Sequence, residues 1–162
     1  MKKNLISILM GSSSDLIHLK GSIKLLKSFK VGFDVKVLSA HRSPKELAKY
    51  VEDATKKGIK VFIAAAGGSA ALAGVVAAHT LAPVIGIPIE TRSLKGLDSL
   101  LSTVQMPSGV PVASMALGKA GAKNAVIFAL EILALSDKKI KSKLVNFRNN
   151  FKKSVLKQKI KL

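Results

Sequence analysis

The sequence predicts an α/β protein: a three-layer αβα sandwich around a flavodoxin-like parallel sheet, with an extra C-terminal helix. Two observations carry this prediction. Short apolar runs alternate with segments in which apolar residues recur every three or four positions, as expected for alternating strands and helices. The 162 residues include no Trp, one Tyr and six Phe, so Ala, Val, Ile and Leu must build the core. Buried parallel strands have this aliphatic composition.

The N-terminal half of the chain is predicted to contain three strands and three helices. Ser14 or Asp15 suits the N-cap of the first helix, because short polar side chains bond the free N–H groups of a first turn. Pro44 is tolerated at the start of the second helix, and Gly58 is a suitable C-terminal stop. The predicted elements are a strand at 5–10, a helix after 15 that ends before 32, a strand at 33–38, a helix at 44–57, a strand at 61–64 and a helix at 69–79.

The C-terminal half continues the alternation and ends in a different kind of helix. Its predicted elements are a strand at 84–87, a helix at 96–104, a strand at 112–115, a helix at 118–135 and a basic helix from 136. We expect one domain over 1–162, with an α/β core at 1–135 and the basic helix at 136–162. The last helix carries an apolar stripe, which we expect to cover its own domain or a neighbouring subunit rather than a membrane surface. The stripe consists of Ile140, Leu144, Phe147, Phe151 and Val155.

The charge is large and unevenly distributed. The net charge is +18, and residues 138–162 contain ten basic residues and no acidic ones, whereas 1–137 contain 17 basic and 9 acidic residues. Such a charge raises the question of nucleic-acid binding. However, only three of the 27 basic residues are Arg, and no aromatic residues interleave with the lysines as a stacking surface. We therefore expect a solvated lysine surface and no specific nucleic-acid partner.

Two further classes are disfavoured by composition. The absence of Cys excludes disulfides and thiolate metal sites, and is compatible with a reducing compartment. Residues 61–89 lack Asp, Glu, Lys and Arg over a length that could span a bilayer. Ala and Gly dominate this segment, and Pro83 and Pro88 would break a helix there. We therefore expect a strand, loop, helix and strand, and no membrane association.

The candidate chemistry lies in three loops that follow the first three strands. Ligands of such sheets bind outside the carboxyl ends of the strands, near the point where the strand order reverses. In the second loop, His41 can change its protonation near neutral pH, and Arg42 offers a fork of donors for phosphate or carboxylate. The pair indicates an anionic substrate and proton transfer, although the alternative of an incidental surface pair remains open.

The first and third loops add an anion site and a wall of small residues. Residues 11–15, Gly-Ser-Ser-Ser-Asp, combine hydroxyls with a helix N-terminus but match neither a P-loop nor a dinucleotide fingerprint. Asp15 either caps the helix or holds a ribose hydroxyl. Around Gly67 and Gly68, the small side chains leave room for a flat ligand, or serve tight helix–sheet packing.

These motifs together resemble the PurE family, over residues of about 5–135. The family contains the N5-carboxyaminoimidazole ribonucleotide mutases of de novo purine synthesis and a relative that carboxylates aminoimidazole ribonucleotide directly. The small third loop favours the mutase branch. The matching motifs are Met-Gly-Ser-Ser-Ser-Asp at 10–15, Ser-Ala-His-Arg-Ser-Pro at 39–44, Gly-Gly at 67–68, Gln-Met-Pro at 105–107 and Gly-Lys-Ala-Gly at 118–121.

The resemblance implies a role for each candidate residue. The implied site consists of His41 as the catalytic acid/base, Ser12, Ser14 and Arg42 at the ribose phosphate, Asp15 at a ribose hydroxyl, and Ser39 and Gly68 as further substrate-binding residues. The implied reaction moves a carboxyl group from N5 to C4 of the ribonucleotide by decarboxylation and recarboxylation, with no metal and no cofactor. The resemblance further implies a homo-oligomer, an octamer, and a cytoplasmic location.

The chain also departs from the family pattern at three positions. Ala71 and Ala73 stand where the mutase branch usually has His and Pro, and Ser108 stands where Arg usually follows the Met-Pro element. His41 is therefore the only imidazole expected in the site, because His18 and His79 fall in predicted helices. Two alternatives stay open: a carboxylase that uses carbon dioxide directly, and a low-activity homologue that binds polyanions.

Overall fold

The computed structural model describes residues 3–158 and contains a five-stranded, fully parallel sheet. The strand order is β2-β1-β3-β4-β5. β2 lies on one side of β1, and β3, β4 and β5 follow one another on the other side, so the strand order reverses at β1. This is the flavodoxin-like order that the alternation of strands and helices predicts. The strands are β1 (Ile6–Met10), β2 (Phe33–Val37), β3 (Val61–Gly67), β4 (Val84–Ile89) and β5 (Ala113–Ser114).

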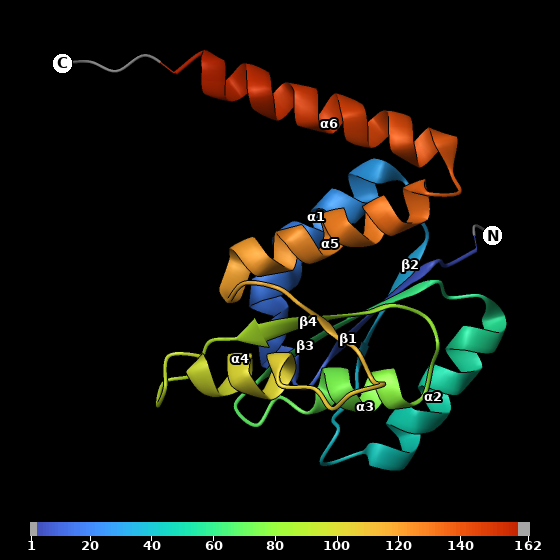
Figure 1. The fold of residues 1–162 in the computed structure, drawn as a ribbon, viewed down its shortest axis with the longest axis vertical. Helices are drawn as coiled ribbons and strands as arrows, with labels where there is room; N and C mark the ends of the chain where they lie inside the picture. The colour runs from blue at the N-terminus through green and yellow to red at the C-terminus, as the bar shows by residue number, and fades with distance from the viewer. Residues whose placement is uncertain (1–2, 159–162) are drawn as a thin grey trace. The chain divides into compact units, whose positions relative to one another are not determined.

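Helices cover both faces of the sheet, which confirms the three-layer αβα prediction. α1 and the first part of α5 lie on one face, and α2, α3 and α4 lie on the other (Figure 1). A short 3-10 turn, η1 (Ser13–Asp15), leads into α1. The helices are α1 (Leu16–Phe29), α2 (Pro44–Lys57), α3 (Leu72–Ala78), α4 (Leu97–Val104), α5 (Gly118–Ala134) and α6 (Lys138–Leu156).

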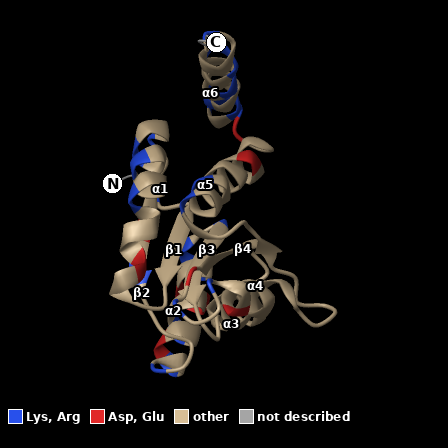
Figure 2. Ribbon diagram, turned by 90° about the vertical axis from the view of Figure 1, so that its left-hand side faces the viewer, with Lys and Arg blue, Asp and Glu red and all other residues tan. Residues whose placement is uncertain are grey.

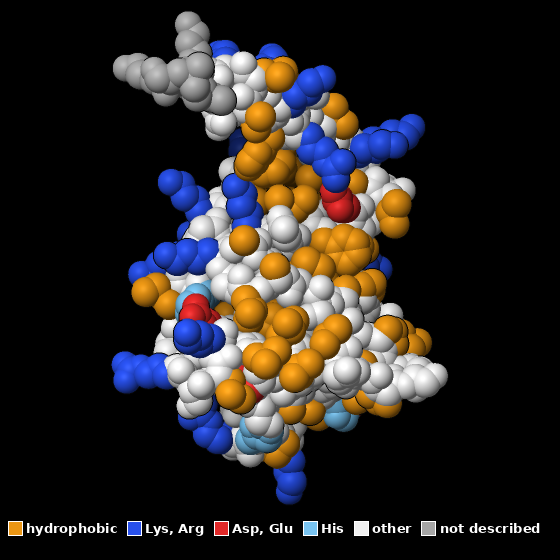
Figure 3. All heavy atoms as spheres, turned by 60° about the vertical axis from the view of Figure 1, so that its left-hand side comes forward, with side chains coloured by type: hydrophobic (Ala, Val, Ile, Leu, Met, Phe, Trp, Pro, Cys, Tyr) orange, Lys and Arg blue, Asp and Glu red, His pale blue; other side chains and the backbone are white. Residues whose placement is uncertain are grey.

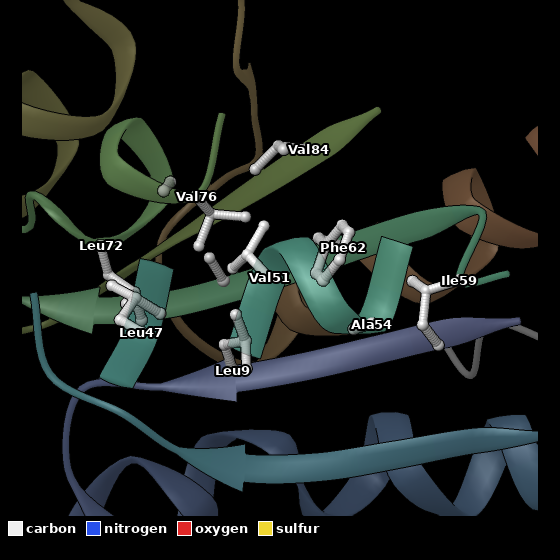
Figure 4. Packing of buried hydrophobic residues seen from close by; sticks show 11 residues of the cluster. Leu9, Leu47, Val51, Ala54, Ile59, Phe62, Leu72, Val76 and Val84 are labelled. Carbon is white, nitrogen blue, oxygen red and sulfur yellow. The ribbon is translucent and has the colours of Figure 1, made fainter. Parts of the chain in front are cut away.

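The core between the sheet and helices α2 and α3 is aliphatic, as the composition predicts. Phe62 on β3 and Leu9 on β1 are fully buried and face Val51 of α2 (Figure 4). Neighbouring strand residues such as Ile63 are buried toward the opposite helices, because successive side chains of a strand alternate between faces. Burial on both faces explains why the strands read as continuous apolar runs.

Residues 61–89 form β3, α3 and β4, which is the expected order of strand, loop, helix and strand. Three boundaries in this segment differ from expectation by two residues or more, including β4, which continues to Ile89 instead of ending at 87. β3 continues to Gly67 instead of ending at 64, because it pairs along β4 until Gly67 lies opposite Ile89. α3 begins at Leu72 instead of 69, because residues 68–71 form tight turns. Among the described residues, no helix has the length and apolarity needed to cross a membrane.

The chain divides into two compact units, 1–129 and 130–162. In the second unit, α6 begins at Lys138, two residues later than predicted. Asp137 is its N-cap: the carboxylate accepts hydrogen bonds from the N–H groups of Lys139 (2.8 Å) and Ile140 (3.1 Å). Residues 159–162 of the predicted basic segment lie outside the described residues.

α6 is amphipathic, and Lys and Arg residues occur along its length (Figure 2). Of the predicted stripe, Ile140 and Leu144 are buried, and the rings of Phe147 and Phe151 pack at a tilt of 60° with their centroids 5.1 Å apart. Val155 is exposed. Elsewhere, the space-filling view shows many Lys and Arg side chains and few acidic ones, as expected of a lysine-rich surface (Figure 3).

Candidate active site

The first loop of the candidate site is organised by a capping box. Ser12 is the N-cap of η1, where its hydroxyl accepts a hydrogen bond from the Ser14 N–H at 3.3 Å. In return, the Asp15 carboxylate accepts a hydrogen bond from the Ser12 N–H at 3.1 Å. This reciprocal arrangement satisfies two donors that a helix start would otherwise leave free. The Asp15 carboxylate thus closes the capping box of η1, whose N-cap is Ser12. At the N-cap of α1, which the sequence predicts to be capped by Ser14 or Asp15, Asp15 makes no side-chain capping hydrogen bond to the helix.

The burial of Asp15 affects the pKa of its carboxyl group. Its side chain is only 8% exposed. Desolvation raises the pKa of the Asp15 carboxyl above its ordinary value, because burial penalises the charged form. The hydrogen bond from Ser12 and the positive charges of His18 and Arg42 oppose this rise.

The second loop is tied internally and to the first loop. The Ser43 hydroxyl donates to the Ser39 carbonyl at 3.1 Å and accepts from the Ser39 N–H at 3.0 Å, which closes the turn ahead of α2. The Arg42 guanidinium donates to the Gly11 carbonyl at 2.8 Å. Its Nε also donates to the Ser39 hydroxyl at 3.4 Å. Arg42 thus bridges the loops that follow β1 and β2.

His41 is exposed, and its ring has no hydrogen-bond partner within residues 3–158. Both ring nitrogens are therefore available to a ligand. Histidine is a common general acid or base in enzymes, so His41 is a candidate for proton transfer.

The third loop supplies a wall with little side-chain volume. Gly68 has a φ of 67°, a left-handed conformation that favours glycine. The next N–H groups close two tight turns, from Ala70 to the Gly68 carbonyl (2.8 Å) and from Ala71 to the Ser69 carbonyl (2.7 Å).

The three loops surround one cavity of about 350 Å³ at the carboxyl ends of β1, β2 and β3. Five of the seven predicted site residues line it: Ser12, Asp15, Ser39, His41 and Arg42. The convergence expected at the point where the strand order reverses is therefore present. The remaining lining residues are Gly11, Ala40, Ala66, Gly67, Ser69, Ala71 and Leu72.

Ser14 and Gly68 are not among the described residues that line the cavity. The Ser14 hydroxyl instead donates to the Ser12 hydroxyl at 2.8 Å, and the Gly68 N–H donates to the Ser99 hydroxyl at 2.9 Å. Ser14 thus contacts a residue that lines the cavity, and Gly68 lies between two lining residues, Gly67 and Ser69.

The other two histidines lie elsewhere. His18 is in α1 and does not line the cavity, and His79 follows the last turn of α3, where it lies 3.3 Å from a carboxylate oxygen of Glu52. Ala71, the first of the three departures, does line the cavity. Within residues 3–158, no group of three His, Cys, Asp or Glu side chains could hold a metal ion.

Sequence reasoning missed two kinds of residue at this site. Ala40 and Leu72 line the cavity without polar chemistry, and only their positions beside His41 and Ala71 could have indicated them. Ser99 contacts the third loop from 31 residues away, and no local pattern marks it.

Comparison with known proteins agrees with this geometry. Residues 5–154 match the family model described as AIR carboxylase. The chain is 51% identical over 148 residues to an N5-carboxyaminoimidazole ribonucleotide mutase of Pyrococcus abyssi, covering 91% of this chain and 84% of the relative. It is 49% identical over 152 residues to the mutase of the same name from Bacillus subtilis, covering 94% of each.

A solved structure gives the same result for the fold. The crystal structure of Treponema denticola PurE superposes with a TM-score of 0.86 at 29% sequence identity, covering 94% of each chain. The family resemblance inferred from the loop motifs is thus confirmed. The family model matches 150 of the 162 residues, and this chain belongs to the AIR carboxylase family.

Proposed function

We propose that this protein is a mutase that converts N5-carboxyaminoimidazole ribonucleotide into 4-carboxy-5-aminoimidazole ribonucleotide in purine biosynthesis. The observation that carries the proposal is the single cavity lined by His41, Arg42, Ser12 and Asp15. It combines one available imidazole with donors for a phosphate. The names of the relatives from Pyrococcus abyssi and Bacillus subtilis support the mutase over direct carboxylation or polyanion binding.

The proposed roles follow from the chemistry of each side chain. Arg42 and the Ser12 hydroxyl bind the ribose phosphate, because a guanidinium and a hydroxyl both donate hydrogen bonds to phosphate oxygens. The buried Asp15 carboxylate binds a ribose hydroxyl, and Ser39 binds the substrate beside Arg42. Ser14 and Gly68 contribute as substrate-binding residues through the contacts that hold Ser12 and the third loop in place.

His41 transfers the proton that the rearrangement requires. In the proposed reaction, the bond between N5 and the carboxylate breaks and releases carbon dioxide, while N5 takes up a proton. The carbon dioxide then bonds to C4, and the C4 proton leaves. One proton is gained and one is lost, so a single acid/base can serve both steps. The small residues of the third loop confine the carbon dioxide beside the ring.

We also propose that the protein is a single domain over 1–162 that acts in the cytoplasm as a homo-octamer. The family match crosses both compact units, which supports one domain with a core at 1–135 and a basic helix at 136–162. Exposed Leu97, Leu101 and Val104 share one face of α4, which supports burial of that face between subunits.

The decisive experiment exchanges the substrates. Purified protein is supplied either with N5-carboxyaminoimidazole ribonucleotide or with aminoimidazole ribonucleotide and bicarbonate, and formation of the 4-carboxy product is followed. We expect rapid turnover only with the first substrate. Turnover that occurs only with the second would assign the protein to the direct carboxylases, and no turnover with either would overturn the proposal.

A further inference from the structure

We propose that Ser99 is a positioning residue for the reaction, because its side chain fixes the third loop against the sheet. This inference rests on the proposed function for its effect on turnover. Ser99 is fully buried in the first turn of α4 and does not line the cavity. It acts through Gly68 and the residues that follow.

The Ser99 hydroxyl bridges the ends of two neighbouring strands. It donates a hydrogen bond to the Ile89 carbonyl at the end of β4, at 2.6 Å. It also accepts one from the Gly68 N–H, directly after the end of β3, at 2.9 Å. Gly67 and Ile89 are the last paired residues of these strands. The Ser99 hydroxyl therefore links β3 and β4 directly beyond their last backbone pair.

The bridge lies where the chain changes direction toward the cavity. Gly68 has the left-handed φ of 67°, and two tight turns follow it before α3 starts at Leu72. Gly67, Ser69 and Ala71, on either side of this turn, all line the cavity. A Cβ at Gly68 would meet no atom within 4 Å, so the space beside its Cα is open. The hydrogen bond from the Gly68 N–H to the Ser99 hydroxyl ties this turn to α4.

A neighbouring hydrogen bond ties the same helix to the chain beyond β4. The Thr91 hydroxyl donates to both oxygens of Asp98, at 3.0 Å each. Because Asp98 and Ser99 are adjacent in the first turn of α4, that turn is secured to residues 89–91 on one side and to the third loop on the other. The start of α4 thus serves as a rigid support for the wall of the cavity.

The test compares Ser99→Ala with Thr103→Val. Thr103 is a second buried residue with a hydroxyl on the same helix, and this hydroxyl donates at 2.7 Å to the Ser99 carbonyl of α4. Ser99→Ala loses two hydrogen bonds and Thr103→Val loses one, so both variants should lose stability. Only Ser99→Ala should accelerate hydrogen exchange at the Gly68 amide, by about tenfold, as expected for the loss of a bond worth roughly 1–1.5 kcal/mol.

Steady-state kinetics then separate positioning from stability. We expect Ser99→Ala to lower kcat about tenfold with KM within about twofold of the wild type, because Arg42 still binds the phosphate while the ring is less well held. Thr103→Val should leave both constants within about twofold. Unchanged exchange at Gly68, or an unchanged kcat despite faster exchange, would overturn the inference.

The proposed function and this inference fail in different ways. If the wild-type protein converts neither substrate, the proposed function is wrong, and Gly68 exchange in the two variants alone decides whether Ser99 fixes the loop. If the wild type is active and the two variants behave alike in both measurements, the function stands and the role of Ser99 is wrong.

Discussion

The two ends of the parallel sheet each carry a cluster of polar residues. The two clusters differ in whether their polar groups have hydrogen-bond partners within the protein. At the amino ends of β1 and β2, the Tyr50 hydroxyl of α2 donates to the Asp34 carboxylate at 2.8 Å and lies 2.7 Å from the Ser7 hydroxyl. At the carboxyl ends, His41 has no hydrogen-bond partner within the described residues, and Arg42 uses its guanidinium only on Gly11 and Ser39.

The difference separates a structural cluster from a site that can bind. Burial raises the pKa of the Tyr50 hydroxyl, so the phenol stays protonated and donates a hydrogen bond to the Asp34 carboxylate. The Ser7 hydroxyl then donates to Tyr50, and each group has a partner inside the protein. A neighbouring cavity of about 450 Å³ exists there too, so cavity size alone does not distinguish the two ends. The two ends are distinguished by whether hydrogen-bond donors and acceptors remain available to a ligand.

The largest effect should come from His41→Asn. The amide keeps a similar volume but cannot exchange a proton near neutral pH, so we expect kcat to fall about 10²- to 10⁴-fold, the usual contribution of a general acid/base. Substrate binding, measured by calorimetry, should persist. The control is His79→Asn, whose imidazole lies outside the cavity and should leave kcat unchanged. An unchanged rate in His41→Asn would remove His41 from the mechanism.

The next largest effect should come from Arg42→Ala. Hydrogen bonds to charged groups contribute about 1.5–3 kcal/mol, so losing the guanidinium should raise KM about 10- to 100-fold, with a smaller change in kcat. Arg148→Ala is the matched control, because Arg148 pairs on the surface with Glu131 in the second unit. If both variants bind substrate equally well, Arg42 does not hold the phosphate.

The opposite end of the sheet should respond in stability rather than activity. Tyr50→Phe removes the hydroxyl that joins Asp34 and Ser7 and leaves those groups without a partner. We expect the free energy of unfolding, from urea titration, to fall by about 1–3 kcal/mol. kcat and KM should match the wild type. A loss of activity greater than the loss of folded protein would contradict the assignment of this cluster as structural.

The smallest effect should be the pH dependence contributed by Asp15. Because the pKa of the Asp15 carboxyl in the folded protein is raised above its ordinary value of 3.8, the folded state binds the proton more tightly than the unfolded state does. Its contribution to stability is therefore full below about pH 4 and is lost as pH rises through the folded pKa.

Asp15→Asn should remove this dependence, since the amide oxygen can still accept from the Ser12 N–H. Urea titrations at pH 3.5 and pH 7 should show that wild type and variant differ less at the lower pH, with the variant slightly the more stable at pH 7. A wild type that gains stability relative to the variant between these values would show that the pKa is lowered instead.

Most of the fold could be predicted from local patterns. The apolar runs of β1 and β4, Pro44 at the start of α2 and Gly58 at its end each act within a few residues, so their consequences are visible in the sequence. The candidate site was predictable for a related reason. The parallel alternation requires the loops after β1, β2 and β3 to meet at one edge, and those loops contain His41 and Arg42.

What the sequence could not predict depends on contacts between distant segments. The sequence by itself determined the αβα fold class, the aliphatic core and the loops that contain the candidate site residues, because periodicity and turn residues act locally. Only the tertiary structure decided that Gly68 would be held by Ser99, that Tyr50 would join Asp34 to Ser7, and that Arg42 would reach Gly11. Such hydrogen bonds join groups that become neighbours only when the sheet forms, and no local pattern encodes them.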